Sequence, residues 1–157
     1  MKKGLLSILT VLAVVSAVNA DPRFGVIGFT DAGAGVFITD DVYNGSLTVA
    51  TSSNDAASKS ETTSIGVNAN YKIAADSVTA YTVGVGYKTI SGEFSAVEID
   101  TYTILDLNVG VERALSSNVV LTAETSLYRT TTLDISSTKT ETTGLFSSAR
   151  VGVAVLF

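Results

Sequence analysis

The feature that most constrains this chain is the side-chain alternation in its last stretch, Gly144 to Phe157, which reads GLFSSARVGVAVLF. Period-two alternation is typical of a β-strand, whose successive side chains point to opposite faces. One face carries small residues and Arg150, which suits a narrow enclosed interior, so the other, apolar face is expected to meet lipid. Counted back from the C-terminus, the apolar face consists of Phe157, Val155, Val153 and Val151.

The same alternation recurs along most of the chain, between residues that favour turns. After residue 20, no apolar run approaches the roughly 20 residues that cross a bilayer as a helix. Hydrophobic residues make up 46% of the sequence and charged ones only 16%, whereas about a quarter of a typical soluble domain is charged. This composition predicts an all-β protein whose strands face a membrane. The clearest strands are predicted at Thr62–Ile73, Ser77–Thr89, Thr101–Arg113 and Asn118–Thr131.

The first 20 residues, MKKGLLSILTVLAVVSAVNA, have the layout of a secretory signal peptide. Lys2 and Lys3 precede an apolar core from Leu5 to Val15, and small residues lead to a cleavage site between Ala20 and Asp21. The apolar core is too short for a helical membrane anchor, which needs roughly 20 residues. We therefore expect residues 1–20 to be removed on export and residues 21–157 to form one domain.

The composition also excludes several kinds of function. Two of the ten basic residues leave with the leader, so the net charge changes from −5 to −7, and nucleic-acid binding needs a basic patch instead. The sequence has no cysteine and no histidine, which removes thiol chemistry, thiolate metal sites and the commonest general base. A serine nucleophile would have only a carboxylate or a lysine as its base, and no spacing indicates one. We expect no catalytic residue, no cofactor and no metal site.

The connections between the predicted strands alternate in character. Ala74–Asp76 and Leu115–Ser117 are tight turns, whereas three other connections are longer and rich in Ser, Thr and acidic residues. Short turns at one end and long polar loops at the other are typical of bacterial membrane-spanning β-barrels, with the turns periplasmic and the loops extracellular. The long loops are predicted at Asn54 to Glu61, Gly92 to Asp100 and Thr132 to Thr143.

The N-terminal part of the domain leaves the strand count open. Asn44-Gly45 predicts a two-residue hairpin turn that joins strands at Val36–Val42 and Ser46–Ser52, because both residues tolerate φ > 0. Before it, a turn at residues 31–33 gives eight strands in all, whereas one long bent strand through this glycine-rich stretch gives seven. Bacterial single-chain barrels have an even number of strands, so we predict eight.

The signal peptide, the chain length, the alternation, the loop asymmetry and the terminal Phe157 together resemble the small eight-stranded outer-membrane β-barrels. These include the OmpX-like proteins and the membrane domain of OmpA-type proteins. The resemblance covers essentially the whole mature chain, but it is architectural, and no loop motif names a ligand. It implies an antiparallel up-and-down transmembrane barrel in the outer membrane of a Gram-negative bacterium. It also implies that the barrel-assembly machinery recognises the C-terminal strand through Val151, Val153, Val155 and Phe157.

The predicted register turns six charged side chains into the barrel interior, three basic and three acidic. A buried charge needs a partner, and Arg150 is expected to pair with Glu124, with Asp106 nearby, since the three lie at similar heights on consecutive strands. Side chains can fill the interior of an eight-stranded barrel. The set is therefore either a structural salt-bridge network in a plugged barrel or a charged constriction in a pore. The six residues are Lys72, Lys88, Arg150, Asp106, Glu112 and Glu124.

Four tyrosines near the ends of predicted strands, Tyr71, Tyr81, Tyr87 and Tyr128, are candidates for the aromatic girdles that mark membrane interfaces, although the register turns Tyr128 inward. The sequence thus predicts a non-catalytic integral outer-membrane protein with a structural or surface-interaction role, whose extracellular loops contact a ligand. One alternative is a narrow, porin-like passive pore for ions or small solutes. Another is a soluble periplasmic or secreted β-sandwich subunit, whose apolar faces pack against each other.

Overall fold

The computed structural model describes residues 21–30, 33–54, 60–94, 97–135 and 138–157. Over these ranges all regular structure is β-strand, and no helix is long and apolar enough to cross a membrane. The strands are β1 (Arg23–Phe29), β2 (Gly33–Thr39), β3 (Tyr43–Asn54), β4 (Ser60–Ala75), β5 (Thr79–Phe94), β6 (Val97–Ala114), β7 (Val119–Ile135), β8 (Thr138–Leu145) and β9 (Ala149–Leu156).

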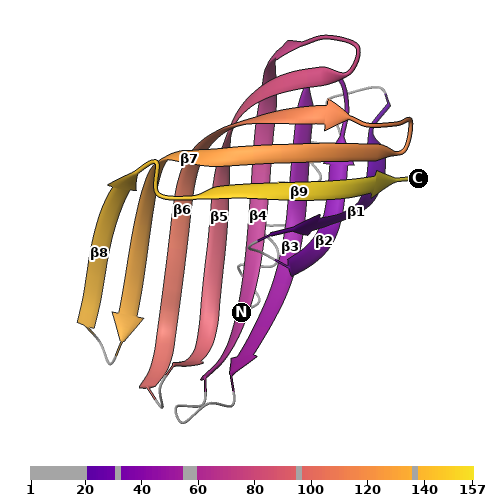
Figure 1. Ribbon diagram of the computed structural model, residues 1–157. Coiled ribbons are helices and arrows are strands. Elements are labelled where there is room, and N and C mark those ends of the chain that lie inside the picture. Colours follow the sequence, from indigo (N-terminus) through magenta and orange to yellow (C-terminus); the bar gives the residue numbers. More distant parts are fainter. Residues whose placement is uncertain (1–20, 31–32, 55–59, 95–96, 136–137) are drawn as a thin grey trace.

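The strands form one antiparallel sheet that closes on itself (Figure 1). β1 pairs with both β2 and β9, and β6 pairs with β7, so the ring of pairings is complete. Because β9 pairs with the first part of β7 and β8 with its last part, these two segments make up a single barrel strand. The barrel is therefore eight-stranded, which confirms the predicted fold class and strand count. A closed sheet excludes the β-sandwich, which needs two packed sheets.

The barrel wall separates an apolar outer surface from a largely polar interior. On β5, Tyr81 and Val85 are 58% and 55% exposed, whereas the neighbouring Ala80 and Thr82 are 6% and 3% exposed. This alternation is the predicted one, and it follows from the period of two in a strand. Other large apolar residues exposed on the outer face are Val26, Val36, Val49, Ile73, Leu105, Leu107, Val151, Val153 and Val155.

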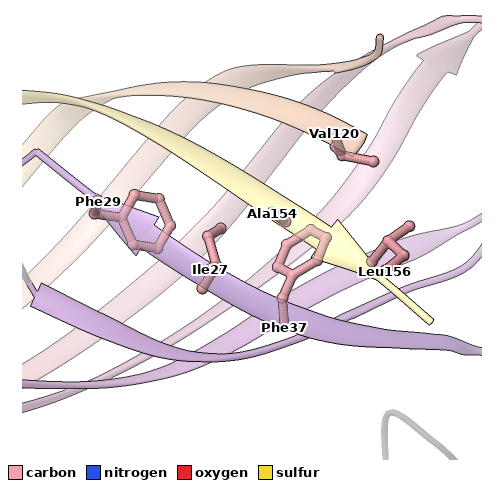
Figure 2. Packing of buried hydrophobic residues seen from close by; sticks show 6 residues of the cluster. All are labelled: Ile27, Phe29, Phe37, Val120, Ala154 and Leu156. Carbon is pink, nitrogen blue, oxygen red and sulfur yellow. The ribbon is translucent and has the colours of Figure 1, made fainter. Parts of the chain in front are cut away.

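The interior itself has an apolar part and a polar part. Strands β1, β2, β9 and the start of β7 contribute a cluster of buried apolar side chains, which we call the apolar lining (Figure 2). Strands β3 to β7 contribute buried Asn, Ser, Thr and Glu side chains instead. The apolar lining consists of Ile27, Phe29, Phe37, Val120, Ala154 and Leu156.

The first tight turn lies before the predicted Asn44-Gly45, so that prediction was wrong. β2 ends at Thr39 and β3 already begins at Tyr43. Asn44 lies within β3 and pairs with Thr39, while Gly45 is the next residue of the strand. An Asn-Gly pair has a strong intrinsic preference for a turn, but it does not form one where a neighbouring residue stabilises a different turn.

The Asp40 carboxylate closes the observed turn. Its Oδ1 accepts the backbone N–H of Val42 at 2.6 Å and that of Tyr43 at 2.7 Å, which is an Asx-type turn. The predicted and the observed turn both pair even-numbered with odd-numbered positions. For that reason Val36 and Leu47 share the outer face, as the alternation predicted, although they pair with each other only in the observed register.

Side chains close the other two tight turns in the same way, close to their predicted positions. Asp76 Oδ1 accepts the N–H groups of Val78 and Thr79 at 2.8 and 2.7 Å. These backbone hydrogen bonds stabilise the ionised form and lower the pKa of Asp76 below its usual value. In the third turn, Ser116 Oγ accepts the N–H of Val119 at 3.1 Å. All three turns lie at one end of the barrel, since its strands run alternately up and down.

The strands on one side of the barrel are much longer than those on the other. β4, β5, β6 and β7 have 16, 16, 18 and 17 residues, whereas β1 and β2 have 7 each. About 9–11 residues suffice for a tilted strand to cross a bilayer. The hairpin ends of β3 to β8 therefore extend beyond the β1–β2 hairpin as a sheet, which we call the projecting sheet (Figure 1).

This sheet corrects two of the three predicted long loops, Gly92 to Asp100 and Thr132 to Thr143, because most of their residues are in strands. Of the loop predicted at Asn54 to Glu61, residues 55–59 lie outside the described residues. Polar residues on both faces indicated loops, but a sheet with water on both sides carries polar residues on both faces as well. Threonine, which is abundant here, also favours strands. The strands that face each other across the three connections end and begin at Asn54 and Ser60, Phe94 and Val97, and Ile135 and Thr138.

Candidate functional site

Among the residues that the structure describes, the polar part of the lumen contains three ion pairs, and the lower one lies nearest the tight turns. Lys72 Nζ of β4 lies 2.8 Å from Glu112 Oε1 of β6. Lys72 also donates to the backbone carbonyl of Asp40 at 2.6 Å, and Asn44 Nδ2 donates to Glu112 Oε2 at 2.7 Å. The two charged side chains are only 7% and 11% exposed, so their mutual pairing replaces most of their hydration.

Glu124 of β7 forms the middle ion pair with Arg150 of β9. The guanidinium donates to Glu124 Oε2 from Nε at 2.9 Å and from Nη2 at 2.6 Å. The side-chain amides of Asn68 and Asn70 also donate to this carboxylate, each at 3.0 Å. Arg150 lies 4.5 Å from the centre of the Phe29 ring, a cation–π contact that joins the polar part of the lumen to the apolar lining.

Asp106 of β6 forms the upper ion pair with Arg129 of β7, on the side of the projecting sheet. Arg129 donates from Nε to Asp106 Oδ1 at 2.7 Å and from Nη2 to Oδ2 at 2.9 Å. This two-pronged geometry is the strong form of an arginine–carboxylate contact. Ser126 Oγ donates to Asp106 Oδ1 at 2.8 Å.

A β-bulge brings Arg129 into the lumen. The β6–β7 pairing skips Leu127, which is an extra residue in β7. The insertion reverses the faces of the rest of the strand, so Tyr128 is 46% exposed on the outside, which corrects its predicted inward position. The sequence carried a signal for this reversal, because two large residues in succession, Leu127 and Tyr128, interrupt the alternation.

Hydrogen bonds join the lower and middle ion pairs into one network. Asn44, which donates to Glu112, accepts a hydrogen bond from Asn70 Nδ2 at 2.8 Å. Asn70 donates from the same nitrogen to Glu124. The amide oxygens of Asn70 and Asn108 are buried and have no donor among the residues that the structure describes.

All six charged residues singled out from the sequence lie on the lumen side of the wall. Arg129 was not expected in the lumen, and it forms the ion pair with Asp106. Lys88 is consequently left over, and no residue in the described part of the chain forms an ion pair or hydrogen bond with its ammonium group. The pairs are Lys72 with Glu112, Arg150 with Glu124, and Arg129 with Asp106.

A cavity of about 70 Å³ borders both the middle and the upper ion pair. Its walls come from β3 to β7, from β9 and from the connection before β9, and none of its lining residues belongs to β1 or β2. Small residues such as Gly66 and Gly86 keep the space open beside Lys88. The charged residues that line it are Lys88, Arg129, Arg150, Asp106 and Glu124.

The outer surface carries exposed aromatic and apolar residues near both ends of the strands. Tyr71 and Tyr81 are 47% and 58% exposed towards the tight turns. Tyr87 and Tyr128 are 44% and 46% exposed towards the projecting sheet. With Tyr128 on the outside, all four tyrosines occupy the positions that interfacial girdles would need.

The projecting sheet ends in an unpaired edge. Among the described strands, β8 pairs only with β7, so the backbone groups along its other side have no strand partner. Nearly all residues of β8 are exposed, and Lys139 lies opposite Asp134 in the β7–β8 pairing. Within the described ranges, no group of three or more acidic side chains is placed to hold a metal ion.

Comparisons with known proteins add little to this geometry. No protein-family model matches the sequence, and no curated protein matches it. One similar solved structure is a major outer membrane protein from Thermus thermophilus, at 16% sequence identity and a TM-score of 0.41. The match covers 88% of this chain and 100% of that one. At this level of likeness it carries no conclusion about this chain.

Proposed function

We propose that this protein is a non-catalytic integral β-barrel of the outer membrane of a Gram-negative bacterium. Residues 1–20 would serve as a cleaved export leader, the lumen would be plugged, and the projecting sheet would contact an extracellular partner. The observation that carries the proposal is the sidedness of the wall, with large apolar side chains outside and paired charges inside. Exposed apolar surface on this scale marks contact with a membrane or a partner.

A gel-shift experiment tests the barrel in its proposed environment. The mature protein is refolded in detergent, and boiled and unboiled samples are compared in SDS. We expect a compact band that resists SDS and shifts on boiling, because the part of the sheet that closes into the barrel has no free edge. A single unchanged band from protein that stays soluble without detergent would contradict the membrane assignment.

Two substitutions on the C-terminal part of the chain test the orientation. Val153 is 48% exposed on the outer face of β9, and a charge on the lipid face of a barrel is destabilising near the bilayer midplane. Val153→Asp should therefore lower the membrane yield much more than Ser147→Asp in the exposed connection between β8 and β9. Equal yields would overturn the orientation.

The outer residues of β9 are also the proposed assembly signal. Phe157→Ala should lower the yield of folded protein in cells that rely on the barrel-assembly machinery. Refolding of the same variant in detergent should be unchanged, since no machinery takes part there. Equal losses in both settings would indicate a general folding defect instead. The residues of the signal are Val151, Val153, Val155 and Phe157.

The proposed surface interaction uses the free edge of β8. Unpaired backbone groups of an edge strand can accept an additional extended strand, and such pairing gives affinity through main-chain hydrogen bonds. The suitable partner is thus an extended segment of an extracellular protein. A labelled peptide with the sequence of Tyr128–Ile135 is a fitting probe, because β8 already pairs with that sequence.

Proline substitutions separate the two edges of β8. Successive residues of a strand direct their N–H groups to opposite sides, so Thr140→Pro and Glu141→Pro affect different edges. We expect one variant to lose peptide binding while its barrel stability is retained, and the other to weaken the β7–β8 pairing. Undiminished peptide binding by both variants would contradict the edge as the interaction site.

A narrow pore is the second candidate, and the cavity above the Glu124–Arg150 pair is the observation in its favour. Planar-bilayer recordings distinguish the two functions. A plugged barrel should give no steady openings, and Arg150→Ala should not create a regular conductance. Steady openings of the wild-type protein that change with Arg150→Ala would favour the pore.

A further inference from the structure

Lys88 is a lumen cation that no described carboxylate neutralises. Because Arg129 takes Asp106, the described charges of the polar part of the lumen include one more basic than acidic group, and Lys88 is the excess. Lys88 is partly buried, and a partly desolvated charge without a partner is unfavourable. An anion from outside the chain would remove this imbalance.

The walls of the cavity are rich in groups that donate to an oxyanion. Lys88 offers an ammonium group, and the guanidinium of Arg150 borders the same space. Ammonium, guanidinium and hydroxyl donors together suit a tetrahedral group with several acceptor oxygens. The volume of about 70 Å³ has room for a small group but not for a large organic molecule, since pockets for drug-sized ligands measure about 300–1,000 Å³. The hydroxyl donors available on the wall include those of Ser46 and Ser148, whereas Ser126 and Thr48 already donate to Asp106 and to the carbonyl of Gly66.

The β1 and β2 strands do not line this cavity. Its described lining residues come from the other strands and from the connection before β9. β1 and β2 have only 7 residues each, fewer than the roughly 9–11 of a full crossing. Among the described strands the wall is therefore shortest at this hairpin, and we expect a headgroup of the surrounding outer leaflet to approach the cavity from this side.

We propose that this cavity binds a phosphate group, with Lys88 as its direct contact and Arg150 and the hydroxyls of Ser46 and Ser148 as further donors. The group comes either from free phosphate or from the headgroup of an outer-leaflet lipid that reaches over the β1–β2 hairpin. This site is independent of the free β8 edge, because none of its lining residues belongs to β8.

Titration calorimetry with inorganic phosphate tests the site on mature protein refolded in a sugar-based detergent, which contains no phosphate itself. Lys88→Gln should weaken binding at least about tenfold, since it removes a charge-assisted contact. Lys88→Arg should restore most of it. The matched control Lys139→Gln changes an exposed lysine of β8 and should bind like the wild type. The boiled and unboiled gel bands show that each variant is folded.

A competition experiment identifies the source of the phosphate. Short-chain phosphatidic acid and the diacylglycerol with the same tails are added to the phosphate-bound protein. Displacement by phosphatidic acid alone supports a lipid headgroup, and phosphate binding that neither lipid displaces supports free phosphate. Displacement by both lipids would show that the tails bind instead, and it would overturn the proposal. No binding of phosphate or phosphatidic acid, or equal binding by Lys88→Gln and the wild type, would overturn it as well.

Discussion

The two parts of the lumen are filled by different kinds of interaction. The apolar lining on β1, β2, β7 and β9 fills space by side-chain packing alone (Figure 2). The polar part on β3 to β7 fills it with ion pairs whose members come from different strands. Packing tolerates gradual change, because its strength follows the apolar volume and area that remain in contact. A buried ion pair does not, because removal of one member leaves the other uncompensated.

The largest expected effect is therefore in the polar part, at the middle ion pair. Glu124→Leu leaves Arg150 and two amides without their acceptor, and we expect it to lower the free energy of unfolding by about 3–5 kcal/mol. The double variant Glu124→Leu/Arg150→Met removes both charges and should recover most of this loss. Urea unfolding in lipid vesicles measures both. Additive losses in the double variant would show that the pair is not a coupled unit.

The apolar lining should respond in proportion to volume. Ile27 is 2% exposed, and Ile27→Val should lower the free energy of unfolding by about 0.5–1.5 kcal/mol, whereas Ile27→Ala should lower it by about 2–5 kcal/mol. The same urea experiment gives these values. A loss that is as large for valine as for alanine would erase the contrast between the two parts of the lumen.

Overpacking tests the same lining from the other direction. A Cβ atom on Gly152 would lie 2.6 Å from the ring of Phe29 and 2.7 Å from Thr122 Oγ1, whereas one on Gly28 would meet nothing within 4 Å. Gly152→Ala should therefore destabilise the barrel by about 1–3 kcal/mol. Gly28→Ala is the matched control and should leave the gel shift and the unfolding curve close to those of the wild type. Equal effects of the two substitutions would mean that the apolar lining accommodates the added methyl group without loss of stability.

The smallest effect concerns an exposed carboxylate, Asp76 in a tight turn, in contrast to the buried Glu124. Its backbone hydrogen bonds lower its pKa in the folded state, so its charge stabilises the fold above the unfolded pKa of about 3.9. This contribution is lost as the pH falls through the lower, folded pKa. Asp76→Asn should be slightly less stable than the wild type at pH 7, and the difference should disappear in strong acid. A difference that grows on acidification would contradict this sign.

Local sequence patterns were enough to predict the class of the fold. Period-two alternation located the outer faces of β4, β5, β6 and β9, and the short Asp- and Ser-containing turns separated the strands. The position of the first turn was predicted wrongly, because Asn44-Gly45 has a strong intrinsic preference for a turn whereas Asp40 stabilises a different one. The pairing shifted by six residues, but the inward and outward faces were still assigned correctly, since both turns pair even-numbered with odd-numbered positions.

The sequence by itself determined which side chains share a face, because the geometry of a strand is local and needs no partner. The alternation also predicted the Glu124–Arg150 pair, which the structure confirms, but only the tertiary structure decided the partners of the other charges. The extra residue Leu127 places Arg129 in the lumen, and Lys88 then has no ion-pair partner among the described residues. The face to which a side chain points thus depends on how two strands pair. The tertiary structure also decided that the Thr-rich segments are a sheet with one free edge, because polarity reports contact with water and not the absence of a strand.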